Sequence, residues 1–170
     1  PDAAPQSLAM PMILGNTRDE TRAFIDPRGS QLAGLDWSNL AERLANKIRV
    51  DLDPRWVTAQ YRARFPGWSP ERVFYAATTA GRSWPGQVIE ADARAAAGAE
   101  RTWVYQLDRP SPVDPLRGAA HTDDIPYVFG AFDAPGSFSG TGVRAREISA
   151  AMIDGVCGLA RSGVPEIDRW

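Results

Sequence analysis

The sequence predicts an α/β protein that is rich in helices and has a few strands belonging to a larger, mainly parallel sheet. Only two segments strongly favour β-structure, and the roughly ninety residues between them carry the spacing of amphipathic helices. A two-stranded ribbon is marginal in water, so strands this far apart need further strands beside them. We therefore expect the other strands to come from sequence outside this chain, with helices covering the sheet. A homo-oligomer that completes the sheet is the alternative.

The two predicted strands are short runs of residues that favour extended backbone. The apolar run 12–14 is followed by Gly15 and Asn16, which predicts a buried strand that ends in a turn. Residues 102–108 contain Thr, Trp, Val and Tyr and predict the second strand. Three prolines between residues 110 and 115 then predict an extended loop.

Four helices are predicted between the strands. Asp36 is the expected N-cap of the first, and Asp53-Pro54 and Ser69-Pro70 are start signals for the next two. A fourth helix is expected from about residue 85 to 98. The apolar stripe of the first helix consists of Trp37, Leu40, Leu44 and Ile48. After a glycine-rich loop at 130–142, the apolar period predicts a last helix that ends at Gly163.

Composition limits the classes of partner. The chain has 170 residues, of which 44% are hydrophobic and 24% charged, as in an ordinary globular domain. Its net charge of −2 gives too weak a field for a nucleic-acid or anionic-membrane binder, and its apolar runs are too short to span a membrane. One cysteine, Cys157, cannot form an intramolecular disulfide, so we expect a soluble protein of either a cytoplasmic or a secreted compartment.

His121 is the only histidine and follows the proline-rich loop. Loops commonly carry catalytic groups, and imidazole can accept and return a proton near neutral pH. The alternative is a surface or capping histidine. One histidine with Asp123 and Asp124 lacks the second imidazole of a zinc or iron site, so we expect no metal and no cofactor.

Asp19 and Glu20 form a second candidate, because they follow the first predicted strand. A carboxylate just past a strand of an open α/β sheet lies at the edge where such folds bind ligands. The alternative is a helix-start role, in which both charges face the positive end of a helix dipole.

Taken together, the two segments resemble type-B carboxylesterases, the α/β-hydrolase branch that includes para-nitrobenzyl esterases and cholinesterases. That family has a strand, a glycine, a glutamate and a phenylalanine at the spacing of Gly15, Glu20 and Phe24. It also has a Gly-x-x-His motif that continues into a segment similar to residues 125–130, and its Ala-Arg-Thr-Gly-Asp-Pro is similar to residues 160–165.

The resemblance implies that residues 1–170 are the C-terminal part of a single α/β-hydrolase domain, with the helical region 36–98 covering the active-site pocket. Glu20 and His121 would then be the acid and the base of a Ser-Glu-His triad. Neither a Gly-x-Ser-x-Gly nucleophile motif nor a His-Gly-Gly oxyanion loop occurs in the sequence. The expected partners are therefore an N-terminal chain or segment that supplies the serine and the oxyanion hole, and a small-molecule ester.

Three residues depart from the family pattern. Thr21 and Thr122 replace glycines, and Asp124 replaces a glutamate. The resemblance assigns the acid to Glu20, which leaves Asp19 as a helix-start or surface carboxylate. Two other readings stay open: a non-catalytic binding module that lacks the nucleophile, and a Cys157–His121 hydrolase.

Overall fold

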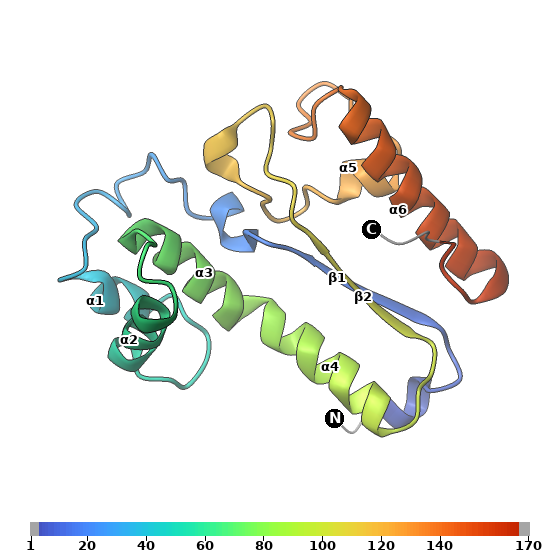
Figure 1. Ribbon diagram of the computed structural model, residues 1–170, viewed down its shortest axis with the longest axis horizontal. Helices are drawn as coiled ribbons and strands as arrows, with labels where there is room; N and C mark the ends of the chain where they lie inside the picture. The colour runs from blue at the N-terminus through green and yellow to red at the C-terminus, as the bar shows by residue number, and fades with distance from the viewer. Residues whose placement is uncertain (1–3, 167–170) are drawn as a thin grey trace.

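The computed structural model describes residues 4–166, which form two neighbouring strands with helices on either side (Figure 1). Helix α4 lies on one side of the strands, and α5 and α6 lie on the other (Figure 1). The elements in chain order are η1 (Ala4–Ser7), β1 (Met12–Thr17), η2 (Glu20–Ala23), α1 (Leu40–Ala45), α2 (Pro54–Arg64), α3 (Pro70–Arg82), α4 (Trp84–Ala96), β2 (Thr102–Leu107), η3 (Pro115–Arg117), α5 (Ile125–Val128) and α6 (Val143–Ser162).

β1 and β2 pair directly and in parallel, with Met12 opposite Thr102 and Thr17 opposite Leu107. The prediction of a helix-rich α/β chain with parallel strands is confirmed. The sheet has two strands within the described residues, so the larger sheet stays a prediction. Because the strands are parallel, the turn after β1 and the loop after β2 emerge at the same edge.

The predicted turn at Gly15 and Asn16 is wrong, because β1 continues through both residues to Thr17. Gly15 lies beneath the ring of Tyr105 on β2, and a Cβ at this position would fall 1.9 Å from the tyrosine Cε1. A glycine inside a strand often marks such a close approach. From the sequence alone, this glycine cannot be told apart from one that ends a strand.

The helix predictions are confirmed for α2 and α3, whose N-caps are Asp53 and Ser69. The prediction for Asp36 is wrong. Its carboxylate accepts hydrogen bonds from the Ser38 and Asn39 amides in a preceding turn, and α1 begins only at Leu40. Aspartate stabilises such turns as readily as helix starts, since in both cases its oxygen satisfies free amides.

Two separate hydrophobic cores hold the chain together. The first joins α1, α2, α3 and the segment after η2, and it includes Leu40, Leu44 and Val73. The second joins the end of β2 to α5 and α6 through Leu107, Tyr127, Ala145, Ile148 and Met152. The helical region and the strand-based scaffold thus each have their own packing.

Arg94 of α4 ties the start of the chain to this scaffold. Its fully buried guanidinium donates to the carbonyl oxygens of Ser7 and Met10 and to the Thr102 hydroxyl. A guanidinium suits this position because its donors are fixed in one plane. The contacts fix the segment that leads into β1.

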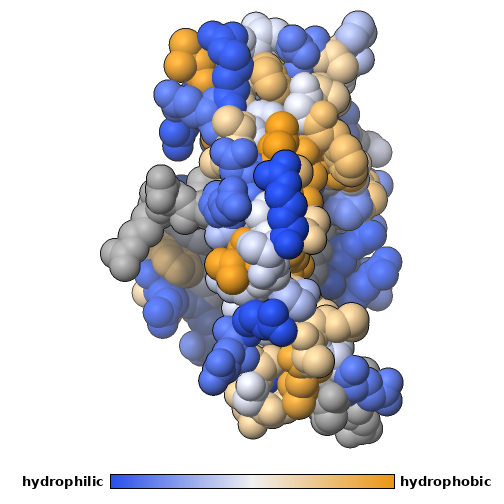
Figure 2. Space-filling view, turned by 90° about the vertical axis from the view of Figure 1, so that its right-hand side faces the viewer, coloured by the Kyte–Doolittle hydropathy of each residue, from blue (hydrophilic) through white to orange (hydrophobic). Residues whose placement is uncertain are grey.

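The end of the molecule that carries α6 presents apolar residues interspersed with charged ones (Figure 2). Val143 and Val156 are among the exposed apolar side chains of α6, and Arg144 and Glu147 form an ion pair in its first turns. None of the helices within residues 4–166 combines the length and apolar character that crossing a membrane requires.

Candidate active site

Glu20 and His121 meet at the edge where β1 and β2 end. Glu20 begins η2 immediately after β1, and His121 lies in the loop between β2 and α5. Parallel pairing of the strands brings the two together although 101 residues separate them in sequence. The edge beyond the carboxyl ends of parallel strands is where open α/β sheets bind ligands.

The imidazole Nδ1 of His121 lies 2.5 Å from Oε2 of Glu20. The other carboxylate oxygen accepts a hydrogen bond of 2.7 Å from the Thr17 amide, and the Glu20 side chain is only 8% exposed. With Glu20 ionised, Nδ1 must carry a proton, which leaves Nε2 as the acceptor. The His121 side chain is 49% exposed, and Nε2 has no hydrogen-bond partner within residues 4–166. Its geometry is that of an oriented general base.

Asp19 points to the backbone of the same loop and away from the imidazole. Its carboxylate accepts from the Ala119 amide at 3.0 Å and pairs with Arg18 at 3.1 Å. A Cβ on Gly118, whose φ is +64°, would fall 2.6 Å from the Asp19 carboxylate, so glycine is required there. Asp19 makes no side-chain cap bond to η2. Asp19 thus lies at the start of η2, as expected, but its carboxylate holds the histidine loop and does not cap the helix.

Asp123 and Asp124 also hold this loop. Asp123 forms a 2.8 Å ion pair with Arg117 and accepts from the Ala120 amide. Asp124 accepts a 2.7 Å hydrogen bond from the Tyr105 hydroxyl. Burial, together with this bond, raises the pKa of Tyr105 far above its ordinary value. No cluster of three or more candidate metal ligands occurs within the part of the chain that the structure describes.

Thr122 adopts a left-handed backbone conformation directly after His121, with φ of +70°. A β-branched residue is strained there, whereas glycine is not. Its hydroxyl donates to the His121 carbonyl. The structure thus explains why a glycine suits this position in the family that the motif resembles.

Thr21, at the other glycine of that pattern, is buried against α3. Its hydroxyl lies 2.8 Å from the Thr78 hydroxyl and 2.9 Å from that of Thr79, and its amide donates to Thr79. These hydrogen bonds fix the turn that begins with Glu20 to the helical region.

An aromatic ring lies beside the imidazole. The Phe24 and His121 ring centres are 5.1 Å apart, and the Arg82 guanidinium lies 4.0 Å from the Phe24 ring centre. Cys157 is half-buried on α6, and no hydrogen bond joins it to His121 within residues 4–166. The Cys157–His121 alternative therefore gains no support.

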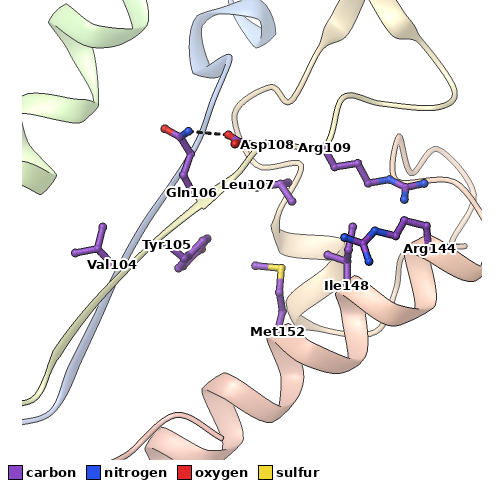
Figure 3. Close-up of a pocket in the computed structure, with 9 residues that line it drawn as sticks. All are labelled: Val104, Tyr105, Gln106, Leu107, Asp108, Arg109, Arg144, Ile148 and Met152. Atoms are coloured by element: carbon purple, nitrogen blue, oxygen red, sulfur yellow. Dashed lines mark hydrogen bonds between the residues drawn. The ribbon is translucent and has the colours of Figure 1, made fainter. Parts of the chain in front are cut away.

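A groove with a volume of about 610 Å³ lies between β2 and α6, and neither Glu20 nor His121 lines it. Figure 3 shows the Arg109 and Arg144 side chains at one end of it, and Ile148 and Met152 rising from α6. The groove follows the edge of β2 that pairs with no strand among the described residues.

Sequence analysis missed the support that Tyr105 and Arg117 give to the histidine loop. Their partners, Asp124 and Asp123, enter the sequence analysis as companions of His121 in a metal site, and Asp124 also as a departure from the family pattern. No spacing along the sequence indicates that the Tyr105 side chain crosses β1 to reach Asp124. The glycine at position 15, over which the Tyr105 ring packs, is the sequence feature that this contact requires.

Three solved structures with a similar fold are esterases. A PNB esterase superposes with a TM-score of 0.66 at 19% sequence identity, covering 98% of this chain and 33% of that chain. A thermophilic PNB esterase gives 0.65 at 20% identity, with the same coverage. An esterase from Clostridium hathewayi, described as able to hydrolyse aliphatic aromatic polyesters, gives 0.59 at 20% identity and covers 94% of this chain and 31% of that chain.

The sequence matches no protein-family model and no curated protein. The structural likeness nevertheless confirms, at the level of the fold, the resemblance to para-nitrobenzyl esterases. The chain spans about a third of the length of the esterases it superposes on.

Proposed function

We propose that this chain is the C-terminal part of an α/β-hydrolase that hydrolyses carboxylic esters through an acyl-enzyme, with Glu20 and His121 as two members of its triad. The observation that carries the proposal is the hydrogen bond between Nδ1 of His121 and the buried Glu20 carboxylate, with Nε2 left as acceptor. The esterase fold of the structural neighbours supports it.

The third triad member, a serine, comes in this proposal from an N-terminal chain or segment, which also provides the oxyanion hole. Nε2 of His121 takes the proton from the serine hydroxyl as its oxygen attacks the ester carbonyl, and Glu20 stabilises the resulting imidazolium. The imidazolium then returns the proton to the leaving alcohol. Water hydrolyses the acyl-serine by the same proton transfers.

The same proposal assigns the remaining architecture. Residues 1–170 belong to a single hydrolase domain whose sheet is continued by strands of the N-terminal part, and residues 36–98 cover the pocket. Support comes from the coverage of the structural matches, which include nearly all of this chain and a third of theirs. By itself, the chain should hydrolyse no ester.

A covalent serine probe tests the proposal. We expect a fluorophosphonate to label the native preparation from which this chain is obtained, on a serine outside residues 1–170. Replacing His121 with Gln should abolish labelling, because the serine then lacks its base. No labelling at all would favour the non-catalytic binding module, whereas serine labelling that persists in His121→Gln would assign the base to another residue.

A further inference from the structure

Arg82 is a cation next to the candidate site that has no carboxylate partner among residues 4–166. Its side chain makes no hydrogen bond or ion pair within residues 4–166; its described contact is the Phe24 ring. Other arginines near the site are paired: Arg18 with Asp19, Arg22 with Glu71, and Arg117 with Asp123.

The position of Arg82 brings this unpaired charge close to His121. Its Cζ is 4.0 Å from the Phe24 ring centre, which is 5.1 Å from that of His121, so the guanidinium lies within about 9 Å of the imidazole. The Debye length at physiological ionic strength is about 8 Å, so a charged group of a substrate bound beside His121 experiences this cation.

Two further features make Arg82 available to a ligand. The residue is exposed at the end of α3, and Phe24 beneath it is 45% exposed. The ring supports the planar guanidinium from one side, leaving its N–H donors free for a planar anion. A carboxylate accepts two parallel hydrogen bonds from such a group.

Building on the proposed function, we propose that Arg82 is a specificity-determining residue that selects esters carrying a carboxylate a few carbons from the scissile bond. The substrate class is therefore anionic monoesters of short diacids, or esters whose alcohol bears a carboxylate. Arg82 binds the charged end of the substrate while His121 acts at the ester.

The test compares matched charged and neutral esters on the assembled enzyme that contains the serine. Mono-4-nitrophenyl glutarate and its methyl ester place the charge on the acyl side, whereas 4-acetoxybenzoate and its methyl ester place it on the alcohol side. We expect the ratio of kcat/KM for the charged over the neutral ester to fall roughly tenfold or more in Arg82→Gln, as for loss of a charge-assisted hydrogen bond. The pair that responds identifies the side that Arg82 contacts.

Arg72 is the matched control, because it also lies on α3 and rests on an aromatic ring, 4.2 Å from the Trp68 centre. It lies ten residues before Arg82 on the same helix, about 15 Å away at the usual rise per residue. Arg72→Gln should leave both ratios unchanged, and Arg82→Lys should retain part of the preference. Unchanged ratios in Arg82→Gln for both pairs would overturn the inference.

Failure of the proposed function has a different signature. If the preparation shows no turnover, calorimetric binding of inert amide analogues replaces the kinetic comparisons. The mono-4-nitroanilide of glutaric acid and its methyl ester replace the first pair, and 4-acetamidobenzoate and its methyl ester replace the second. Weaker binding of either charged member in Arg82→Gln still supports the anion site, whereas equal binding in both pairs refutes it.

Discussion

The acid turn, residues 17–24, and the histidine loop, residues 117–128, treat their functional side chains differently. Glu20 is buried, and each of its carboxylate oxygens has a partner. The His121 side chain is half exposed and held through one nitrogen. The comparison shows a difference in constraint. The Glu20 carboxylate, which would orient the imidazole, is held at both oxygens, whereas His121, which would carry the proton, has an Nε2 without a partner among residues 4–166 and so free to accept a hydrogen bond.

The two regions are also anchored to different parts of the molecule. The acid turn is fixed to α3 by Thr21, and the Tyr75 hydroxyl donates to the Ile25 carbonyl just beyond the turn at 2.6 Å. The histidine loop is tied to β2 by the bond from Tyr105 to Asp124. The Asp19 and Glu20 carboxylates accept hydrogen bonds from Ala119 and His121, which join one region to the other.

The largest expected effect comes from the orienting carboxylate. In the assembled enzyme, Glu20→Gln should lower kcat by about 10⁴-fold, the size seen when an amide replaces the carboxylate of a serine-protease triad. The amide oxygen can still accept from Thr17, so the thermal midpoint should change little. Steady-state kinetics and a melting curve of the same preparation measure both quantities.

Asp19→Asn is the matched control, since its amide oxygen can still accept from Ala119. It loses only the exposed ion pair with Arg18, which is worth at most about 1 kcal/mol. We expect turnover within a few-fold of wild type. If Asp19→Asn cripples the enzyme and Glu20→Gln does not, the acid has been assigned to the wrong residue.

The pH profile tests the role of the half-exposed histidine. A histidine base must be neutral, so kcat/KM should rise with pH to a plateau between pH 5 and 8. Initial rates between pH 5 and 8 measure it. A flat profile under acylation-limited conditions would remove His121 from the role of base.

Gly15→Ala should detach the histidine loop from the strands. The added Cβ would displace the Tyr105 ring and with it the bond to Asp124, at a cost of about 3 kcal/mol, the upper end for overpacking. Chemical unfolding of the assembled protein measures the change. In a Tyr105→Ala background the same substitution should cost less than about 1 kcal/mol, and an equal cost in both backgrounds would contradict the contact.

Thr122→Gly should stabilise the histidine loop. Removing the side chain from a left-handed position relieves about 1–2 kcal/mol of backbone strain. The greater flexibility of glycine in the unfolded chain and the loss of the hydrogen bond from the Thr122 hydroxyl cancel part of this gain. The net gain should be under about 1 kcal/mol, seen as a small rise in thermal midpoint. Thr122→Ala keeps the Cβ and should show no gain; a rise of equal size would rule out backbone strain.

The smallest effect concerns the anchor of the acid turn at alkaline pH. Burial raises the pKa of Tyr75 from 10.0 to about 12, so the unfolded chain releases this proton first. The stability contribution is complete below pH 10 and declines between pH 10 and 12. Tyr75→Phe should make the decline shallower in unfolding experiments across that range. An unchanged slope would show that the hydroxyl titrates normally.

The elements that sequence analysis predicted are those with local signals. Helices α2 and α3 begin with an N-cap and a proline, and α6 ends at Gly163, whose φ of +74° fits its role. Prediction failed where one residue type stabilises both helix starts and turns. Asp36 is predicted to cap a helix, but it stabilises a turn ahead of α1.

The candidate site also has a part that the sequence predicts and a part that it does not. Glu20 and His121 were chosen through motif spacing, and the structure places them in contact, while their catalytic roles stay predictions. The supporting contacts of Tyr105 and Arg82 join segments far apart in the chain. Such contacts depend on strand pairing and helix placement, and no periodicity along the sequence encodes them.

The direct pairing of β1 with β2 has an evolutionary consequence. The helical region lies between two strands that already hold each other in register, and it has its own core, so α1 and α2, which among the described residues do not hydrogen-bond to the acid turn, can vary in length and shape without shifting the strand register. In the proposed hydrolase, such changes, or a new residue at the end of α3, can alter substrate preference while Glu20 and His121 keep their places.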